Sequence, residues 1–299
     1  MRSGRWAIQL LAGMVLVLAA ATECGRPSLE FDGETAYAHV LEQHHFGPRP
    51  VGSEAGRLTA EYIVRELEKH GWATELQDFG FRGVVGTNVI ASKGRGPLYV
   101  LGAHYDTRSL ADRDPVDPTQ PVPGANDGAS GVAVLLELAR VLDLDRASVE
   151  VWLTFFDAED QGRINDWPFS VGASHMAEHL AVHPQAVVVV DMIGDADQQI
   201  YFERNSDERL MRALWAIAAD LGYLTSFIPS YRYSIMDDHI PFRQRGLTVV
   251  DIIDFDYPYW HTTEDTPDKV SPESLERVGR VLEAWLEEHV LGETDGGAS

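Results

Sequence analysis

The feature that most constrains the fold is a series of short apolar runs, rich in Val, Ile and Leu, that alternate with segments of helical periodicity. Five runs are predicted as strands, over residues 84–91, 98–103, 149–156, 186–190 and 247–253. Helices are predicted over residues 57–70, 132–142, 210–221 and 272–290, the last with Ser271 as its N-cap. Because apolar runs of this kind suit strands buried on both faces, the sequence predicts an α/β fold whose mixed, mostly parallel central sheet is flanked by helices on both faces.

A single domain is expected, because no internal repeat, low-complexity tract or long linker divides the chain. The 299 residues, 44% of them hydrophobic, are enough to bury a substantial core. We expect a signal peptide over residues 1–21, an N-terminal segment over 22–56, the domain over 57–292 and a disordered tail over 293–299.

The first 21 residues have the pattern of a secretory leader. Arg2 and Arg5 precede an apolar run over residues 10–21, in which Ala19 and Ala21 suit a cleavage site. The run is shorter than the ~20 residues that span a bilayer. Export to the periplasm or the extracellular space, without a transmembrane span, is therefore predicted.

Cys24 is the single cysteine of the chain. A cysteine just after an apolar leader resembles a bacterial lipoprotein site, but Glu23 in front of it is a poor match, so lipid anchoring is disfavoured. With one cysteine, neither an intrachain disulfide nor a thiolate metal site can form. Any metal must therefore be held by histidines and carboxylates.

The net charge excludes some classes of partner. The chain has 24 basic and 47 acidic residues, a formal charge of −23. Such a field repels nucleic-acid phosphates and anionic lipid surfaces, so neither is an expected partner. It mildly favours cationic substrates, of which the free α-amino group of a peptide is one.

Acidic residues and a histidine gather at the ends of the predicted strands. Directly after apolar strands come His104, Asp106, Asp157, Glu159, Asp160, Asp191 and Asp254. In α/β sheets, ligands bind in the crevice at the carboxyl ends of the strands. This pattern therefore predicts a site rather than scattered surface charge.

Three motifs supply candidate ligands. The glycine-rich segment 124–131 places Asp127 near a helix N-terminus, where capping is the ordinary role. Of the adjacent carboxylates Glu159 and Asp160, one can bind a metal while the other acts as a base, the ordinary alternative being solvated surface charge. His261 follows a Tyr/Pro/Trp cluster, where a histidine is more often structural. Together, one imidazole and two carboxylates form a three-ligand set typical of catalytic zinc, with the fourth position open.

Six motifs in sequence order carry a resemblance to a known family: His104-x-Asp106, Ala125-Asn-Asp-Gly-Ala-Ser-Gly131, Phe156-Asp-Ala-Glu-Asp160, Val190-Asp-Met-Ile-Gly194, Asp237-Asp-His-Ile-Pro-Phe242 and Trp260-His261. Their order and spacing resemble the zinc aminopeptidase family that also contains the animal-type glutaminyl cyclases. The resemblance makes residues 57–292 the catalytic domain and implies that Asp127, Asp160 and His261 bind zinc, with Glu159 as general acid/base. Asp160 stands where the family more often has Glu, which bears on metal affinity rather than on the identity of the ligand.

The resemblance leaves two reactions open. The aminopeptidases bind two zinc ions, the second through residues like His104 and Asp191, with Asp127 as the bridge. In the cyclases, Asp191 and Asp238 instead form a hydrogen-bonded acidic network beside Glu159, and His104 is not a ligand. Both sets of residues are present in this chain.

Features near the C-terminus favour the cyclase. The string over residues 237–242 resembles the cyclase version, and Trp260 directly before His261 is the cyclase arrangement, in which an indole walls a pocket for a glutamine side chain. Trp167 is a second candidate wall, with ordinary packing as the alternative for both tryptophans. We therefore expect a zinc-dependent glutaminyl-peptide cyclotransferase, an acyltransferase that converts the N-terminal glutamine of peptides to pyroglutamate and releases ammonia. An exported zinc aminopeptidase is the alternative, and a binding protein that has lost the reaction is disfavoured because Glu159 and all three ligands are intact.

Overall fold

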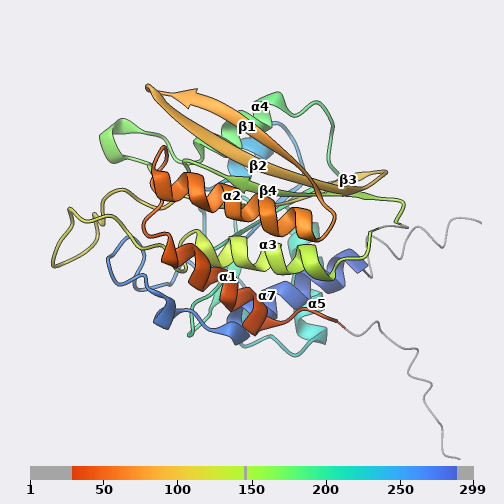
Figure 1. Ribbon diagram of the computed structural model, residues 1–299. Coiled ribbons are helices and arrows are strands. Elements are labelled where there is room, and N and C mark those ends of the chain that lie inside the picture. Colours follow the sequence, from red (N-terminus) through yellow and green to blue (C-terminus); the bar gives the residue numbers. More distant parts are fainter. Residues whose placement is uncertain (1–28, 145–146, 288–299) are drawn as a thin grey trace, which may run out of the picture.

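The computed structural model describes residues 29–144 and 147–287 (Figure 1). The predicted signal peptide, Cys24 and the predicted tail over residues 293–299 lie outside the described residues. Within these two ranges, no helix has the length and apolar character needed to cross a membrane.

A six-stranded mixed sheet forms the centre of the molecule. Its strand order is β1-β2-β4-β3-β5-β8, with bounds β1 Ala73–Phe81, β2 Val84–Gly94, β4 Glu150–Phe156, β3 Leu98–His104, β5 Ala186–Asp191 and β8 Val249–Ile253. The β4, β3, β5 and β8 strands pair in parallel, whereas β1–β2 and β2–β4 are antiparallel. All five predicted strands are confirmed. The extra strand, β1, escapes prediction because it lies at the sheet edge and exposes most of its polar side chains.

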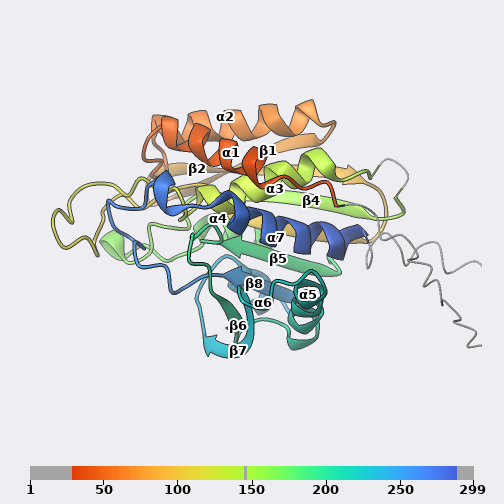
Figure 2. The same ribbon diagram turned by 90° about the horizontal axis from the view of Figure 1, so that it is seen from below.

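Helices cover both faces of the sheet, as predicted. One face carries α1 Gly33–His45, α2 Glu54–Lys69, α3 Ala129–Val141, α5 Glu208–Asp220 and α7 Pro272–Ala284. Figures 1 and 2 show α1, α2, α3 and α7 as one layer, and their apolar side chains form one buried cluster with the strands. A second cluster on the other face packs under α4 Val171–His179 and α6 His239–Gln244. A small parallel sheet of β6 Ile200–Glu203 and β7 Phe227–Tyr233 completes the fold.

The core extends N-terminal to residue 57, the expected start of the domain. The α1 helix belongs to the segment 22–56, yet it packs on α3 and α7. The α2 helix begins at Glu54, capped by Ser53, whose side chain accepts a hydrogen bond from the Gly56 N–H. The predicted N-cap of α7 is confirmed, since the Ser271 hydroxyl accepts from the Ser274 N–H.

The α3 helix brings the glycine-rich segment to the carboxyl ends of the strands. Every residue of α3 from its start to Ala139 is buried. At Gly131 a side-chain carbon would lie 2.5 Å from the Val190 carbonyl oxygen and 2.9 Å from the Ala103 Cβ. Only glycine therefore permits the close approach of α3 to β5 and β3 that carries Asp127 to the strand ends.

This close approach gives a stability prediction. The Gly131→Ala variant should lower the free energy of unfolding by about 1–3 kcal/mol, because the added methyl overpacks a site bounded by backbone. Gly80→Ala in β1 is the matched control, since nothing lies within 4 Å of its added carbon. Urea unfolding of both variants checks this; equal unfolding midpoints for the two would contradict it.

Candidate active site

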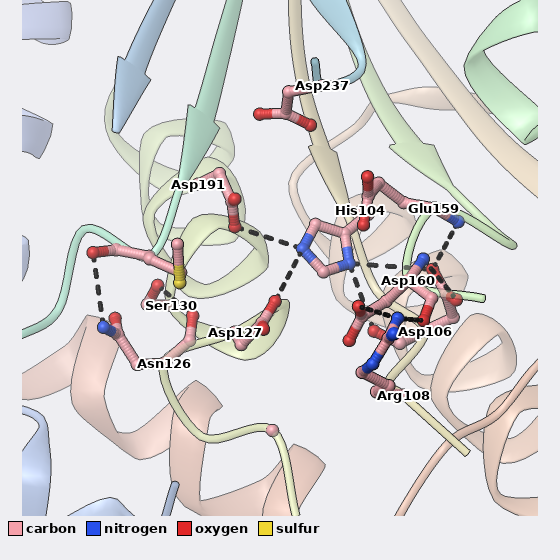
Figure 3. Close-up of polar contacts among 12 residues, drawn as sticks. His104, Asp106, Arg108, Asn126, Asp127, Ser130, Glu159, Asp160, Asp191 and Asp237 are labelled. Carbon is pink, nitrogen blue, oxygen red and sulfur yellow. Dashed lines mark hydrogen bonds and ion pairs between the residues drawn. The ribbon is translucent and has the colours of Figure 1, made fainter. Parts of the chain in front are cut away.

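The structure brings the predicted ligands together at the carboxyl ends of β3, β4 and β5 (Figure 3). His104 ends β3, Glu159 and Asp160 follow β4, and Asp191 ends β5. Asp127 arrives from the loop before α3, and His261 arrives from the loop after β8. All six side chains are at least nine-tenths buried.

The first group consists of Asp127, Asp160 and His261, whose ligand atoms all lie within 4.8 Å of one another. His261 Nε2 lies 3.0 Å from Asp160 Oδ1 and 3.9 Å from Asp127 Oδ2. Asp127 Oδ2 and Asp160 Oδ2 are buried and make no hydrogen bond to any described residue. Buried carboxylate oxygens without a donor are costly, and a divalent cation shared by these three side chains would satisfy them. The group therefore fits a metal ion.

A second group shares Asp127 with the first. His104 Nε2 lies 3.2 Å from Asp127 Oδ1 and 3.1 Å from Asp191 Oδ1. Asp127 thus turns one oxygen to each histidine, as a carboxylate that bridges two cations would. Burial alone would lower the pKa of His104, but its contacts with Asp106, Asp127 and Asp191 raise that pKa well above its usual range.

The turn after β4, which contains Glu159 and Asp160, is held by its backbone. The Asp106 carboxylate accepts hydrogen bonds from both backbone N–H groups, at 2.9 Å from Glu159 and 3.1 Å from Asp160. Ala158, just before them, has a left-handed backbone with φ of 60°. Met192 and His261 also have positive φ, so uncommon backbone geometry concentrates at the site, as it does at functional sites generally.

Asp127 is held by its backbone and does not cap α3. The N-cap of α3 is Gly128, which has no side chain, so the capping interpretation is wrong. The Asp265 carboxylate accepts from the Asn126 and Asp127 N–H groups at 2.8 and 3.1 Å and from the Tyr257 hydroxyl at 2.7 Å. This clamp leaves the Asp127 carboxylate free to face the histidines.

Two buried arginines that the motifs do not reveal brace the same loops. Arg49 donates to the carbonyl oxygens of Gly124 and Tyr105 at 2.6 and 3.0 Å. Arg108 donates to the Asp160 carbonyl oxygen at 2.9 Å and forms a two-point ion pair with Asp112 at 2.8 and 2.7 Å. The motifs do not reveal either arginine, because the carbonyl groups of Gly124, Tyr105 and Asp160 become their neighbours only in the fold.

Asp112 also lies beside a candidate ligand. Its Oδ1 is 3.5 Å from His261 Nδ1, on the side of the ring away from Asp160. A carboxylate in this position fixes the orientation and tautomer of a ligating histidine.

A pocket of about 210 Å³ opens onto the two groups. Its aromatic walls are Phe169, Phe255 and Trp260, and Glu159 lies among its lining residues. Trp260 thus occupies the predicted position. Trp167 does not: it packs edge-on against Phe81 with ring centroids 4.8 Å apart, and Phe169 from the same loop lines the pocket instead.

Asp237 lines the pocket, whereas Asp238 does not line it but still adds its charge to the burial that raises the pKa of Glu159. Asp237 lines the pocket together with Glu159 and Asp191 (Figure 3). Asp238 is fully buried behind it, and neither of its carboxylate oxygens has a hydrogen-bond partner among the described residues. Sequence reasoning chose the neighbouring residue because the direction of each side chain depends on how α6 begins.

Behind Asp237 lies a third buried group of titratable residues. Asp237, His239 and Asp251 have ligand atoms within 4.8 Å of one another. His239 stands between two carboxylates, with Nδ1 3.5 Å from Asp251 Oδ2 and Nε2 3.5 Å from Glu203 Oε2. This group adjoins the pocket wall, because Asp237 belongs to both.

Burial sets the protonation of the site. It raises the pKa of Glu159 well above its usual range, with the charges of Asp237 and Asp160 adding to the effect and His104 opposing it. Burial likewise raises the pKa of Asp191 to about 7, against the contact with His104. A carboxyl group with a raised pKa can both accept and return a proton near neutral pH.

The contact between Asp112 and His261 gives a prediction about metal binding. Asp112→Ala should weaken Zn²⁺ affinity about 10- to 100-fold, because the imidazole loses the partner that orients it. Competition against a chromogenic chelator measures this directly. Asp117→Ala is the control and should bind Zn²⁺ with the affinity of the parent, because Asp117 lies in the same loop and its carboxylate accepts from Thr119 and Gln120. Affinities for Asp112→Ala within twofold of the parent would refute the orienting role.

Comparison with known proteins agrees with this geometry. The sequence profile of peptidase family M28 matches residues 87–286. A Bos taurus glutaminyl-peptide cyclotransferase-like protein is 27% identical over 283 residues, covering 81% of this chain and 72% of the relative. The crystal structure of Porphyromonas gingivalis glutaminyl cyclase superposes with a TM-score of 0.81 at 30% identity, covering 86% of this chain and 98% of that one.

The solved structures that resemble this chain include peptidases as well as cyclases. A leucine aminopeptidase precursor from Bacteroides thetaiotaomicron has a TM-score of 0.80 at 28% identity, covering 86% of this chain and 97% of that one. The family profile runs from β2 to the end of α7 and contains all the ligands described above. The chain therefore belongs to peptidase family M28.

Proposed function

We propose that the protein is a glutaminyl-peptide cyclotransferase, which converts the N-terminal glutamine of a peptide to pyroglutamate and releases ammonia. The observation that carries this proposal is the small pocket above Glu159, walled by Phe169, Phe255 and Trp260. At about 210 Å³ it is smaller than the ~300–1,000 Å³ of typical ligand pockets, which suits one side chain folded back on its own amine. The named cyclases among the relatives support the same reaction.

Zn²⁺ is the cation that we propose for Asp127, Asp160 and His261. One imidazole and two carboxylates make a three-ligand set that leaves a fourth position for a substrate. When bound, the ion would supply Lewis acidity that polarises the γ-carboxamide oxygen of the glutamine.

Glu159 is the residue that moves protons. The neutral α-amine of the substrate attacks the γ-carboxamide carbon while Glu159 takes one proton from the attacking nitrogen, and the bond from that carbon to the amide nitrogen then breaks. Glu159 returns the proton to the departing ammonia, a task suited to its raised pKa. Asp191 and Asp237 complete the acidic network beside it, in place of the Asp238 expected from the sequence. Because the reaction is intramolecular, holding the glutamine in the pocket removes much of its entropic barrier.

The second candidate function is an aminopeptidase, favoured by the group of His104, Asp127 and Asp191. These side chains have the geometry for a second cation next to the first, as two-metal hydrolases require. Glu159 would then take a proton from water, and the water would attack the first peptide bond.

Peptide assays with mass readout separate the two functions. With Gln-initiated peptide, we expect a mass loss equal to one ammonia from the intact chain. Release of the first residue from Gln- or Leu-initiated peptide would establish the aminopeptidase instead. Metal analysis gives an independent test, since one tightly bound zinc per chain fits the cyclase and two fit the peptidase.

Replacing the proposed acid/base tests the mechanism. Glu159→Gln should reduce turnover by roughly two or more orders of magnitude, because general acid–base catalysis contributes about that much. Zinc content should stay unchanged, since Glu159 belongs to neither ligand group. Glu264→Gln, an exposed change in the His261 loop, is the matched control. Turnover of Glu159→Gln within a few-fold of the control would overturn the assignment.

We also propose that the protein is exported, on the strength of the leader over residues 1–21. The free peptide N-termini that the reaction requires fit that setting. Sequencing the N-terminus of the protein purified from whole cells and medium of its host checks this: a start after Ala21 supports export, and an intact Met1 contradicts it.

A further inference from the structure

Arg163 is the one Lys or Arg among the described residues that line the pocket. The floor around it is acidic, with Asp127, Glu159, Asp191 and Asp237. A cation at the edge of such a pocket is not needed to bind a positively charged α-amine. The Arg163 side chain must therefore have a role other than binding the α-amine.

The loop around Arg163 places its side chain at the outer edge of the pocket beside Phe169 and Trp260, which we call the rim. Arg163 is exposed, and its guanidinium carbon lies 5.8 Å from the centroid of Phe169, one of the pocket walls. Its backbone is left-handed, with φ of 67°, and its N–H donates to the Trp167 carbonyl oxygen at 2.7 Å. The loop therefore places the exposed arginine beside the Phe169 ring, at the mouth of the pocket.

Arg113 lies in the same way on a second wall of the pocket. Its guanidinium carbon is 3.9 Å from the centroid of Trp260, and its backbone N–H donates to the His261 carbonyl oxygen at 3.3 Å. The acidic residues on either side of it are engaged elsewhere, Asp112 with Arg108 and Asp114 with the backbone of Thr263.

Neither guanidinium has a carboxylate within 4.0 Å over residues 29–144 and 147–287. Stacking on an aromatic ring leaves the N–H edge of an arginine available, and that edge binds carboxylates through two parallel hydrogen bonds.

We propose that Arg163 and Arg113 select peptides that carry a carboxylate close behind the N-terminal residue. This inference rests on the proposed function, because it needs the first residue in the pocket with its amine near Glu159. The chain of the peptide then leaves across the rim, past Phe169 and Trp260. An Asp or Glu side chain at the second or third position, or the terminal carboxylate of a very short peptide, meets the free guanidinium groups there. The acidic floor excludes the same carboxylate from the pocket itself.

The test compares kcat/KM for Gln-initiated peptides that differ at one position. Glu, Ala or Lys is placed at the second position, then at the third, in peptides with amidated C-termini. A dipeptide with a free C-terminus, compared with its amide, reports on the terminal carboxylate. We expect kcat/KM for the Glu peptide to exceed that for the Lys peptide by about three- to fivefold, the ratio that the free energy of an exposed ion pair produces. The ratio should fall as NaCl rises from about 0.05 M to about 0.5 M, because salt screens exposed charges.

Charge-reversal variants assign the preference to the rim. In Arg163→Glu, kcat/KM for the Lys peptide should exceed that for the Glu peptide at one of the two positions. Arg113→Glu should weaken the preference for the Glu peptide. Arg209→Glu changes the net charge equally on the exposed surface of α5 and should keep the parental order.

The outcomes keep this inference separate from the proposed function. Cyclisation of all peptides at one rate, or a parental preference for Lys, overturns the rim selectivity while the cyclase assignment stands. An unchanged order in Arg163→Glu and Arg113→Glu also overturns it. If no Gln peptide cyclises, the cyclase assignment fails, and the same series begun with Leu and read by hydrolysis decides the rim selectivity.

Discussion

The arrangement of the site depends on how the protein stabilises five buried carboxylates at one edge of the sheet. Asp127, Glu159, Asp160, Asp191 and Asp237 share a site that the solvent hardly reaches. Buried like charges repel strongly and are tolerated only when cations or hydrogen-bond donors compensate them. The orphaned oxygens of Asp127 and Asp160 show where protein donors are lacking, and a metal ion fits between them.

The surrounding fold serves this arrangement by binding the backbone instead of the reactive side chains. Asp106 and Asp265 each accept hydrogen bonds from two backbone N–H groups next to a candidate ligand, so the carboxylates of Asp127 and Asp160 do not have to hold their own loops. Gly131 lets α3 approach the strands closely enough to deliver Asp127. Ala158, directly before Glu159 and Asp160, and His261 have a left-handed backbone, so uncommon backbone geometry lies next to each of the proposed functional side chains.

Much of this follows from the sequence, because apolar runs and the residues just after them are local signals. The five predicted strands and the convergence of Asp127, Asp160 and His261 depend on those signals and on the geometry of parallel sheets. The choice of Asp238 over Asp237, and of Trp167 over Phe169, depended on side-chain direction within irregular loops. Left-handed residues such as Asn165 and Asp166 shape the loop of Trp167, whereas the start of α6 sets the directions of Asp237 and Asp238, and no periodicity reveals either feature. Arg49 and Arg108 escaped notice for a related reason, since each also donates to backbone carbonyl groups far away in the chain, such as those of Gly124 and Asp160.

The central claim is that Asp127, Asp160 and His261 hold one metal ion beside Glu159. Anomalous diffraction at the zinc absorption edge, from crystals of zinc-loaded protein, tests it most directly. The account predicts a peak about 2.0–2.2 Å from one oxygen of each aspartate and from a nitrogen of His261. No peak there, or a peak only among Asp237, His239 and Asp251, would contradict it.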